Sequence, residues 1–560
     1  MNEHFPPART IIRRLLGGLV GLGGLALVCS LLLRIVVDAE ALERRLNPAL
    51  DAAAQGNHEV AIDEVEWGLL AQSLQVSRVT LEPDSQAMED HSASRAETAS
   101  VRATVPTLRL QDLHWWTLLW HQTLSFDDVL VRGPQVHIQS AAGTGETEAA
   151  GATAAPDSTG AEAGGLGLQV QQLRVEEGTL SRGPAGSPAR DSLWGLSLQF
   201  GPLSREAASG TPLAELFADR LSEGGVEGYR HLGADAPYTL RLGPVHVSPS
   251  DSVLRVEDAE FLPSVSDEAF QQQYTYRVNR YRVTVEQVSV AGFDADRFAE
   301  TGALHAARVR VDTLDLSVYR DNHPPEDPND PPPPMPQEAI EQLDRSLRID
   351  TLRVRDSRIQ YTKRPEGVPA SGSISFEDLW ASLYNLTNVP DRMTASTPAV
   401  VEARTRVNGA GRLSTTISVP LRSDGVNGSF GGRVEAMDPR ALNETFVPLG
   451  GVRIESGHVD SLWFQADLEA GTATGRVGGV YRNLEIETLD PATGERGLGD
   501  RLKTIAGGLA LRSKNLPADG DLDTGQIQHT RAEGDSYFKF LWHALRSGIY
   551  SLVGIDRLPR

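Results

Sequence analysis

Residues 60–83 read VAIDEVEWGLLAQSLQVSRVTLEP, and the spacing of their apolar side chains decides the fold. These residues advance by steps of two, three and two, pass through a Trp-Leu-Leu turn, and repeat the steps before Pro83. Residues two apart in a strand share a face of the sheet, whereas a step of three moves the side chain to the other face. We therefore predict a bulge or bend inside each strand that carries the step.

The pattern returns along the chain. Residues 108–138 read LRLQDLHWWTLLWHQTLSFDDVLVRGPQVHI and follow the same order, with one more residue on each side of the turn. The two-three-two step recurs within 281–290, 309–318 and 347–354. Because bulges curl a sheet, we expect a mainly β fold with an elongated, curved, mostly antiparallel β-sheet and an apolar concave side. Ordinary β-sandwich or barrel domains remain the alternative.

The N-terminus contains an apolar run without charge at residues 15–33, which Ile35–Val37 extend after Arg34. About 20 apolar residues span a bilayer. Three arginines precede the run and favour a cytoplasmic N-terminus, so we predict a transmembrane helix over 15–37. A signal peptide cleaved near Ala39 is the alternative. The expected anchor residues are Leu15, Leu16, Leu19, Val20, Leu22, Leu25, Leu27, Val28, Leu31, Leu32 and Leu33.

Composition excludes several classes of protein. The 560 residues include 53 basic and 75 acidic side chains, for a formal charge of −22. No basic stripe is present, which argues against nucleic acid as a partner. The single Cys excludes a disulfide framework and a Cys-based zinc site.

Composition also divides the chain. Residues 140–165 are mostly small or polar and include no Lys or Arg. We expect this segment to be disordered, because it cannot bury enough apolar surface to fold. Residues 323–336 contain eight prolines. Pro336 then begins a predicted short helix with Ile340, Leu343 and Leu347 on one face. We expect a cytoplasmic N-terminus 1–14, the transmembrane helix 15–37, β repeats 38–139, a disordered low-complexity loop 140–165, a β-rich region 166–322, a Pro-rich linker 323–336, a second β-rich region 337–533 and a C-terminal helix 534–560.

The C-terminal segment has helical periodicity, and Asp535 or Ser536 is placed to cap its start. Two interpretations stay open. The apolar face packs on the last sheet, or it lies at a membrane surface or against a partner protein. The residues of this predicted face are Phe538, Leu541, Trp542, Leu545, Ile549 and Leu552.

The repeats resemble those of the AsmA-like superfamily of bacterial envelope proteins. The resemblance includes the anchor, a short predicted helix ending near Gly56, and residues 60–83, 108–138, 347–379 and 432–464. It implies a single-pass bacterial inner-membrane protein whose bulk is a periplasmic β-rich groove. Larger relatives of the TamB type are thought to move lipid along such grooves.

Two functions follow from the resemblance. The first is an anchored protein that binds or conveys phospholipid or another envelope lipid and contributes to outer-membrane homeostasis. The second is a scaffold that acts through contacts with an envelope protein and carries no lipid.

No catalytic motif is present. The sequence has no HExxH, no GxSxG and no GxxxxGK[ST], and its 13 His are scattered. The acidic run DGDLDTG at 519–525 lacks the Gly and Glu that a calcium loop needs. We therefore expect no enzyme activity, no cofactor and no metal site.

Overall fold

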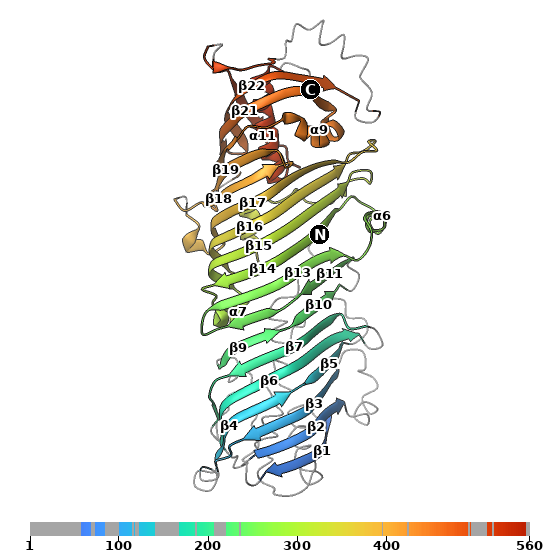
Figure 1. Cartoon of the computed structure of the whole chain (residues 1–560), viewed down its shortest axis with the longest axis vertical. Coiled ribbons are helices and arrows are strands. Elements are labelled where there is room, and N and C mark those ends of the chain that lie inside the picture. The colour runs from blue at the N-terminus through green and yellow to red at the C-terminus, as the bar shows by residue number, and fades with distance from the viewer. Residues whose placement is uncertain are drawn as a thin grey trace. The chain divides into compact units, whose positions relative to one another are not determined.

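The computed structural model describes residues 58–68, 73–83, 100–114, 117, 123–140, 167–184, 188–205, 220–233, 237–394, 396–422, 425–490, 493, 512–517 and 520–555. The protein is mainly β, as predicted (Figure 1). It forms two compact units, Met1–Glu257 with Phe293–Ala303, and Asp258–Gly292 with Leu304–Arg560.

The first unit is a sheet in which neighbouring strands in the sequence mostly pair in antiparallel fashion. β4 and β5 each pair with β6 in parallel, so the connection before β6 must return across the sheet. The elements are β1 (His58–Gly68), β2 (Ser73–Pro83), β3 (Ser100–Gln111), β4 (Thr123–Arg132), β5 (Gln135–Ser140), β6 (Gly167–Pro184), β7 (Asp191–Phe200), β8 (Leu203–Arg205), β9 (Leu221–Val226), β10 (Gly228–Leu232), β11 (Tyr238–Leu242), β12 (Val245–Ser248), the start of β13 (Val253–Pro263) and α7 (Ala295–Thr301).

The second unit is a sheet that runs in chain order from β14 to β23. Among the described residues, neighbouring strands from β14 to β23 pair in antiparallel fashion except β15 with β16. Its elements are α6 (Asp267–Gln272), β14 (Asn279–Ala291), β15 (Leu304–Asp321), α8 (Pro336–Glu341), β16 (Leu347–Arg364), β17 (Gly372–Thr387), η1 (Pro390–Arg392), β18 (Ala399–Val407), β19 (Gly411–Val419), β20 (Gly428–Val434), η2 (Pro439–Leu442), α9 (Asn443–Gly450), β21 (Val452–Glu469), β22 (Thr472–Thr488), β23 (Thr524–Thr530) and α11 (Tyr537–Val553).

The Pro-rich segment 323–336 is the crossover that the parallel pair requires. β15 and β16 run side by side in the same direction, so the chain must travel back between them. Pro336 opens a helix as predicted, but α8 ends at Glu341. The prediction that Leu343 and Leu347 continue its apolar face is wrong. Leu343 is exposed, and Leu347 already begins β16 because its backbone pairs with β15.

Bulges predicted from the two-three-two step are confirmed in β2 and in β15, one in each unit. In β2 the step contains Arg78 at φ 47°, and in β15 it contains Thr313 at φ 55°. In β16 the prediction is wrong in position: the register is unbroken from Ile349 to Leu352, and the bulge lies instead at Asp356, which has φ 50° beside a register shift. One residue in the left-handed conformation shifts the alternation of side chains, so that residues three apart point to the same face of the sheet. Val76 and Val79, three residues apart, are accordingly both buried.

The predicted anchor 15–37, the low-complexity segment and the aromatic turn at 115–120 lie almost entirely outside the described residues. Within the described ranges, no helix has the length and apolar character needed to cross a membrane.

Candidate functional site

Four rows of apolar side chains cross the strands β14–β19 of the second unit. The strand register places the members of each row opposite one another on one side of the sheet, which we call the inner face. The rows are Tyr281–Val318–Tyr361–Ile374, Val283–Leu316–Ile359–Phe376–Val407, Val288–Val311–Val354–Ala381–Ala403–Thr415 and Val290–Val309–Leu352–Leu383–Val401–Ile417.

The inner face is apolar but not closed. Of all the members of the four rows, only Val290 and Val309 are buried, and every other member is half-buried. A sheet with one apolar face ordinarily buries it against a second layer of structure. Here no layer among the described residues buries the rows. An uncovered apolar area of this kind marks a binding surface in a folded protein.

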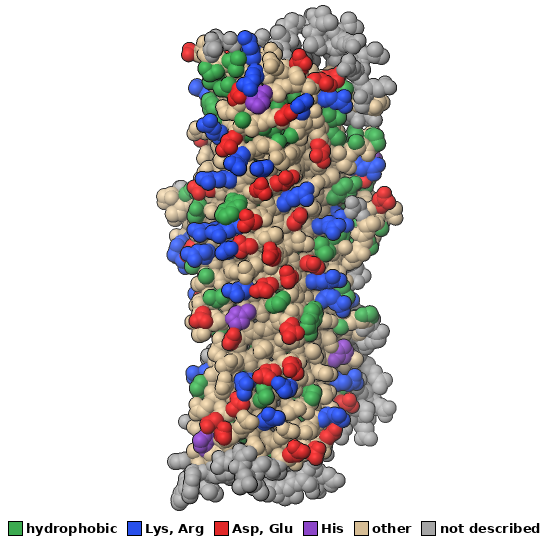
Figure 2. Space-filling view, viewed as in Figure 1, with side chains coloured by type: hydrophobic (Ala, Val, Ile, Leu, Met, Phe, Trp, Pro, Cys, Tyr) green, Lys and Arg blue, Asp and Glu red, His purple; other side chains and the backbone are tan. Residues whose placement is uncertain are grey.

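The opposite face of the same strands is charged. Arg353 and Arg355 alternate with the apolar residues of β16, and Glu402 and Arg404 do the same in β18. Figure 2 shows a face on which basic and acidic side chains are interspersed and apolar ones are sparse. The second unit therefore presents a solvated polar face and an apolar face.

A basic row lies at one end of the inner face. Asn279, Arg320 and Lys363 are paired across β14, β15 and β16, one row beyond the tyrosines. Arg320 Nη1 donates a hydrogen bond to Asn279 Oδ1 at 3.1 Å. Burial, together with the charges of Lys539, Arg320 and Arg277, lowers the pKa of Lys363 below its ordinary value. Two basic side chains thus flank the apolar rows on one side, beyond the tyrosine row.

At β20–β23 the same sheet is closed by α11. Phe540 and Ala544 of the helix are fully buried. Gly548 lies so close to Val477 and Ile527 that a Cβ at that position would meet both side chains. We call this part of the second unit the cap. Its buried core is Met335, Val419, Val426, Phe430, Phe464, Ala466, Leu468, Ala473, Val477, Tyr481, Ile527, Tyr537, Phe540, Leu541, Ala544, Leu552 and Val553.

The residues predicted for the C-terminal helix separate into two sets. Leu541 and Leu552 are buried, and Leu545 and Ile549 pack against the core of the cap. Phe538 is 75% exposed and Trp542 is 37% exposed. The helix therefore packs on the sheet through part of the predicted face and exposes two aromatic rings. Ser536 is its N-cap residue, without a side-chain capping bond.

The structure also brings together three residues for which the sequence analysis predicts no metal-binding role: His529, Asp535 and His543. Their spacings of six and eight residues match no zinc motif considered above, since one residue comes from a strand, one from a loop and one from a helix. Only the packing of α11 on β23 makes them neighbours.

The comparisons with known proteins add no relative. No protein-family model matches the sequence, and no curated protein matches it significantly.

Proposed function

We propose that this protein is an AsmA-like envelope protein, anchored in the bacterial inner membrane by residues 15–37, with its bulk in the periplasm. In this account the curved inner face of the second unit is a groove that binds or conveys phospholipid or another envelope lipid. The protein thereby contributes to outer-membrane homeostasis. It acts by binding and needs no catalytic residue.

The observation that carries the proposal is the incomplete burial of most members of the paired apolar rows. An acyl chain laid along them would remove water from both surfaces, and burying each CH₂ group is worth about 0.8 kcal/mol. The rows run from strand to strand, so a chain lying across β14–β19 would remain in contact with apolar side chains.

The basic row supports a phospholipid rather than a neutral lipid. Arg320 and Lys363 lie directly beyond the tyrosine row, where a headgroup would be when the acyl chains occupy the apolar rows. A phosphate is a natural partner for an Arg fork and a neighbouring ammonium group.

The test is lipid extraction and native mass spectrometry of residues 39–560 purified without detergent. We expect stoichiometric phospholipid to co-purify with the unaltered sequence. Leu383→Asp places a charge on the inner face and should abolish the bound lipid. Its matched control, Ser382→Asp, changes the neighbouring residue on the opposite face of β17 and should retain it.

The scaffold function is the competing outcome of the same test. A folded, soluble protein without lipid would contradict the carrier proposal. Lipid retained equally by Leu383→Asp and Ser382→Asp would contradict the assignment of the inner face.

A further inference from the structure

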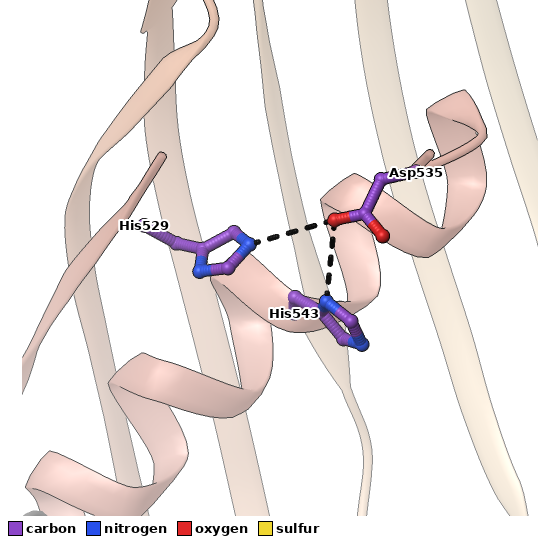
Figure 3. A group of neighbouring side chains, drawn as sticks. All are labelled: His529, Asp535 and His543. Carbon is purple, nitrogen blue, oxygen red and sulfur yellow. Dashed lines mark ion pairs between the residues drawn. The ribbon is translucent and has the colours of Figure 1, made fainter. Parts of the chain in front are cut away.

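A compact cluster of metal-binding side chains lies where β23 meets α11. His529 projects from the strand, His543 from the helix, and Asp535 from the loop that joins them (Figure 3). His543 Nδ1 lies 3.5 Å from Asp535 Oδ2, and His529 Nε2 lies 3.9 Å from the same oxygen. The three ligand atoms all lie within 4.8 Å of one another.

These separations are longer than hydrogen bonds and close to those around a metal ion. A nitrogen and an oxygen that share a hydrogen bond are 2.7–3.2 Å apart. Bonds of about 2.0–2.1 Å in tetrahedral geometry place neighbouring zinc ligands about 3.3 Å apart. A small contraction of the cluster would bring all three atoms to a common ion.

The surroundings of Asp535 orient it for this role. Its side chain is 3% exposed, and Lys539 Nζ donates to its other oxygen, Oδ1, at 2.8 Å. The backbone nitrogen of Ala532 lies 3.4 Å from Oδ2. A hydrogen bond such as that from Lys539 fixes a carboxylate ligand and is typical of metal sites. Lys539 is exposed enough to turn towards water when a cation binds.

The histidines suit the same purpose. His529 and His543 pack edge to face with ring centroids 5.3 Å apart. Both retain some exposure, so the site is open to solvent.

We propose that His529, Asp535 and His543 form a binding site for a divalent transition metal of the zinc class. Two nitrogens and one carboxylate oxygen are a donor set that zinc favours, and three protein ligands leave the fourth position to water. The ion ties α11 to β23 and so fastens the cap to the last strand. This inference is independent of the lipid proposal.

The test uses the full chain after treatment with a chelator. Equilibrium dialysis against Zn²⁺ should give one tightly bound ion per chain, and Zn²⁺ should raise the thermal midpoint. His529→Gln and His543→Gln should each weaken binding at least about tenfold. The matched control is His246→Gln, because His246 faces only one carboxylate, Glu223, at 3.6 Å. This control should bind Zn²⁺ as the unaltered chain does.

Co²⁺ substitution in the unaltered chain gives a readout that does not depend on any variant folding. Intense visible absorption typical of tetrahedral Co²⁺ supports the site, whereas the weak bands of octahedral Co²⁺ overturn it. Absence of tightly bound Zn²⁺ overturns it as well. The proposal is also overturned if His529→Gln and His543→Gln both bind Zn²⁺ as tightly as the unaltered chain does.

Discussion

The inner face and the cap belong to the same sheet, yet one is open and the other is closed. Leu352, Leu383 and Val401, consecutive members of one row, are half-buried on the inner face, and their row continues directly into Phe430 and Ala466 in the cap. There the exposed fractions fall to 4% and 1%. The side chains are equally apolar in both places. The difference shows that the covering helix α11, rather than strand sequence, turns this end of the apolar row into core.

The largest expected effect comes from truncating the same residue type in the two regions. Phe540→Ala removes a fully buried ring from the cap and should lower the free energy of unfolding by about 3–5 kcal/mol. Phe376→Ala removes a half-buried ring from the inner face and should cost roughly 1 kcal/mol. Urea unfolding of the two variants measures the difference. Equal losses would mean that the inner face is as well packed as the cap.

A smaller effect tests how closely α11 approaches the sheet. A Cβ at Gly525 of β23 would clash with the carbonyl oxygen of Gly548 and the backbone of Leu552. Gly525→Ala should therefore push the helix outward and cost about 1–3 kcal/mol, measured by thermal unfolding. Gly450→Ala is the control, since nothing lies within 4 Å of its Cβ position. If the two variants have the same thermal midpoint, α11 does not pack against β23 as closely as the structure shows.

The closed core also makes the cap sensitive to alkaline pH. Burial raises the pKa of Tyr481 to about 12, and its hydroxyl has no hydrogen-bond partner among the described residues. The unfolded chain loses this proton near pH 10, so the stabilising contribution is complete below pH 10 and is lost as the pH rises towards 12. The loss should be roughly 1 kcal/mol per pH unit.

Tyr481→Phe removes the ionisable group and should flatten this part of the stability profile. Urea unfolding at a series of pH values from 8 to about 11.5 measures the slope. An unchanged alkaline slope in the variant would show that Tyr481 is not responsible.

The smallest effect concerns the bulges that keep the inner-face rows aligned. Thr313 is exposed and holds φ 55°, which costs a non-Gly residue roughly 1–2 kcal/mol. Thr313→Gly should therefore raise stability by about 1 kcal/mol. Thr416, exposed in the regular strand β19, is the matched control. Its replacement by Gly should lower stability by about the same amount. Losses at both positions in thermal unfolding would contradict the left-handed bulge.

The sequence predicts local features well because the physics behind them is local. The step of three between Val311 and Leu314 predicts a bulge, and the structure has one at Thr313. The Pro-rich crossover is likewise visible in composition, since no strand contains such a segment.

The packing of α11 on the sheet, and the residues that this packing brings together, depend on contacts between distant parts of the chain. The sequence therefore predicts them less well. The buried face of α11 includes Ala544 and Gly548, which carry little hydrophobic signal but let the helix approach the sheet closely. A pattern search therefore favours large residues and includes Trp542, which the structure exposes. The cluster of His529 and His543 depends on that same packing, so the sequence analysis predicts no metal site.

The most direct test of the account places a photo-crosslinking amino acid in the full chain within bacterial membranes. Adjacent residues on β17 form the matched pair, with Leu383 on the inner face and Ser382 on the opposite face. After irradiation, mass spectrometry identifies what each position has captured. The account predicts phospholipid adducts at Leu383 and none at Ser382. Protein adducts alone at Leu383, or equal lipid capture at both positions, would contradict it.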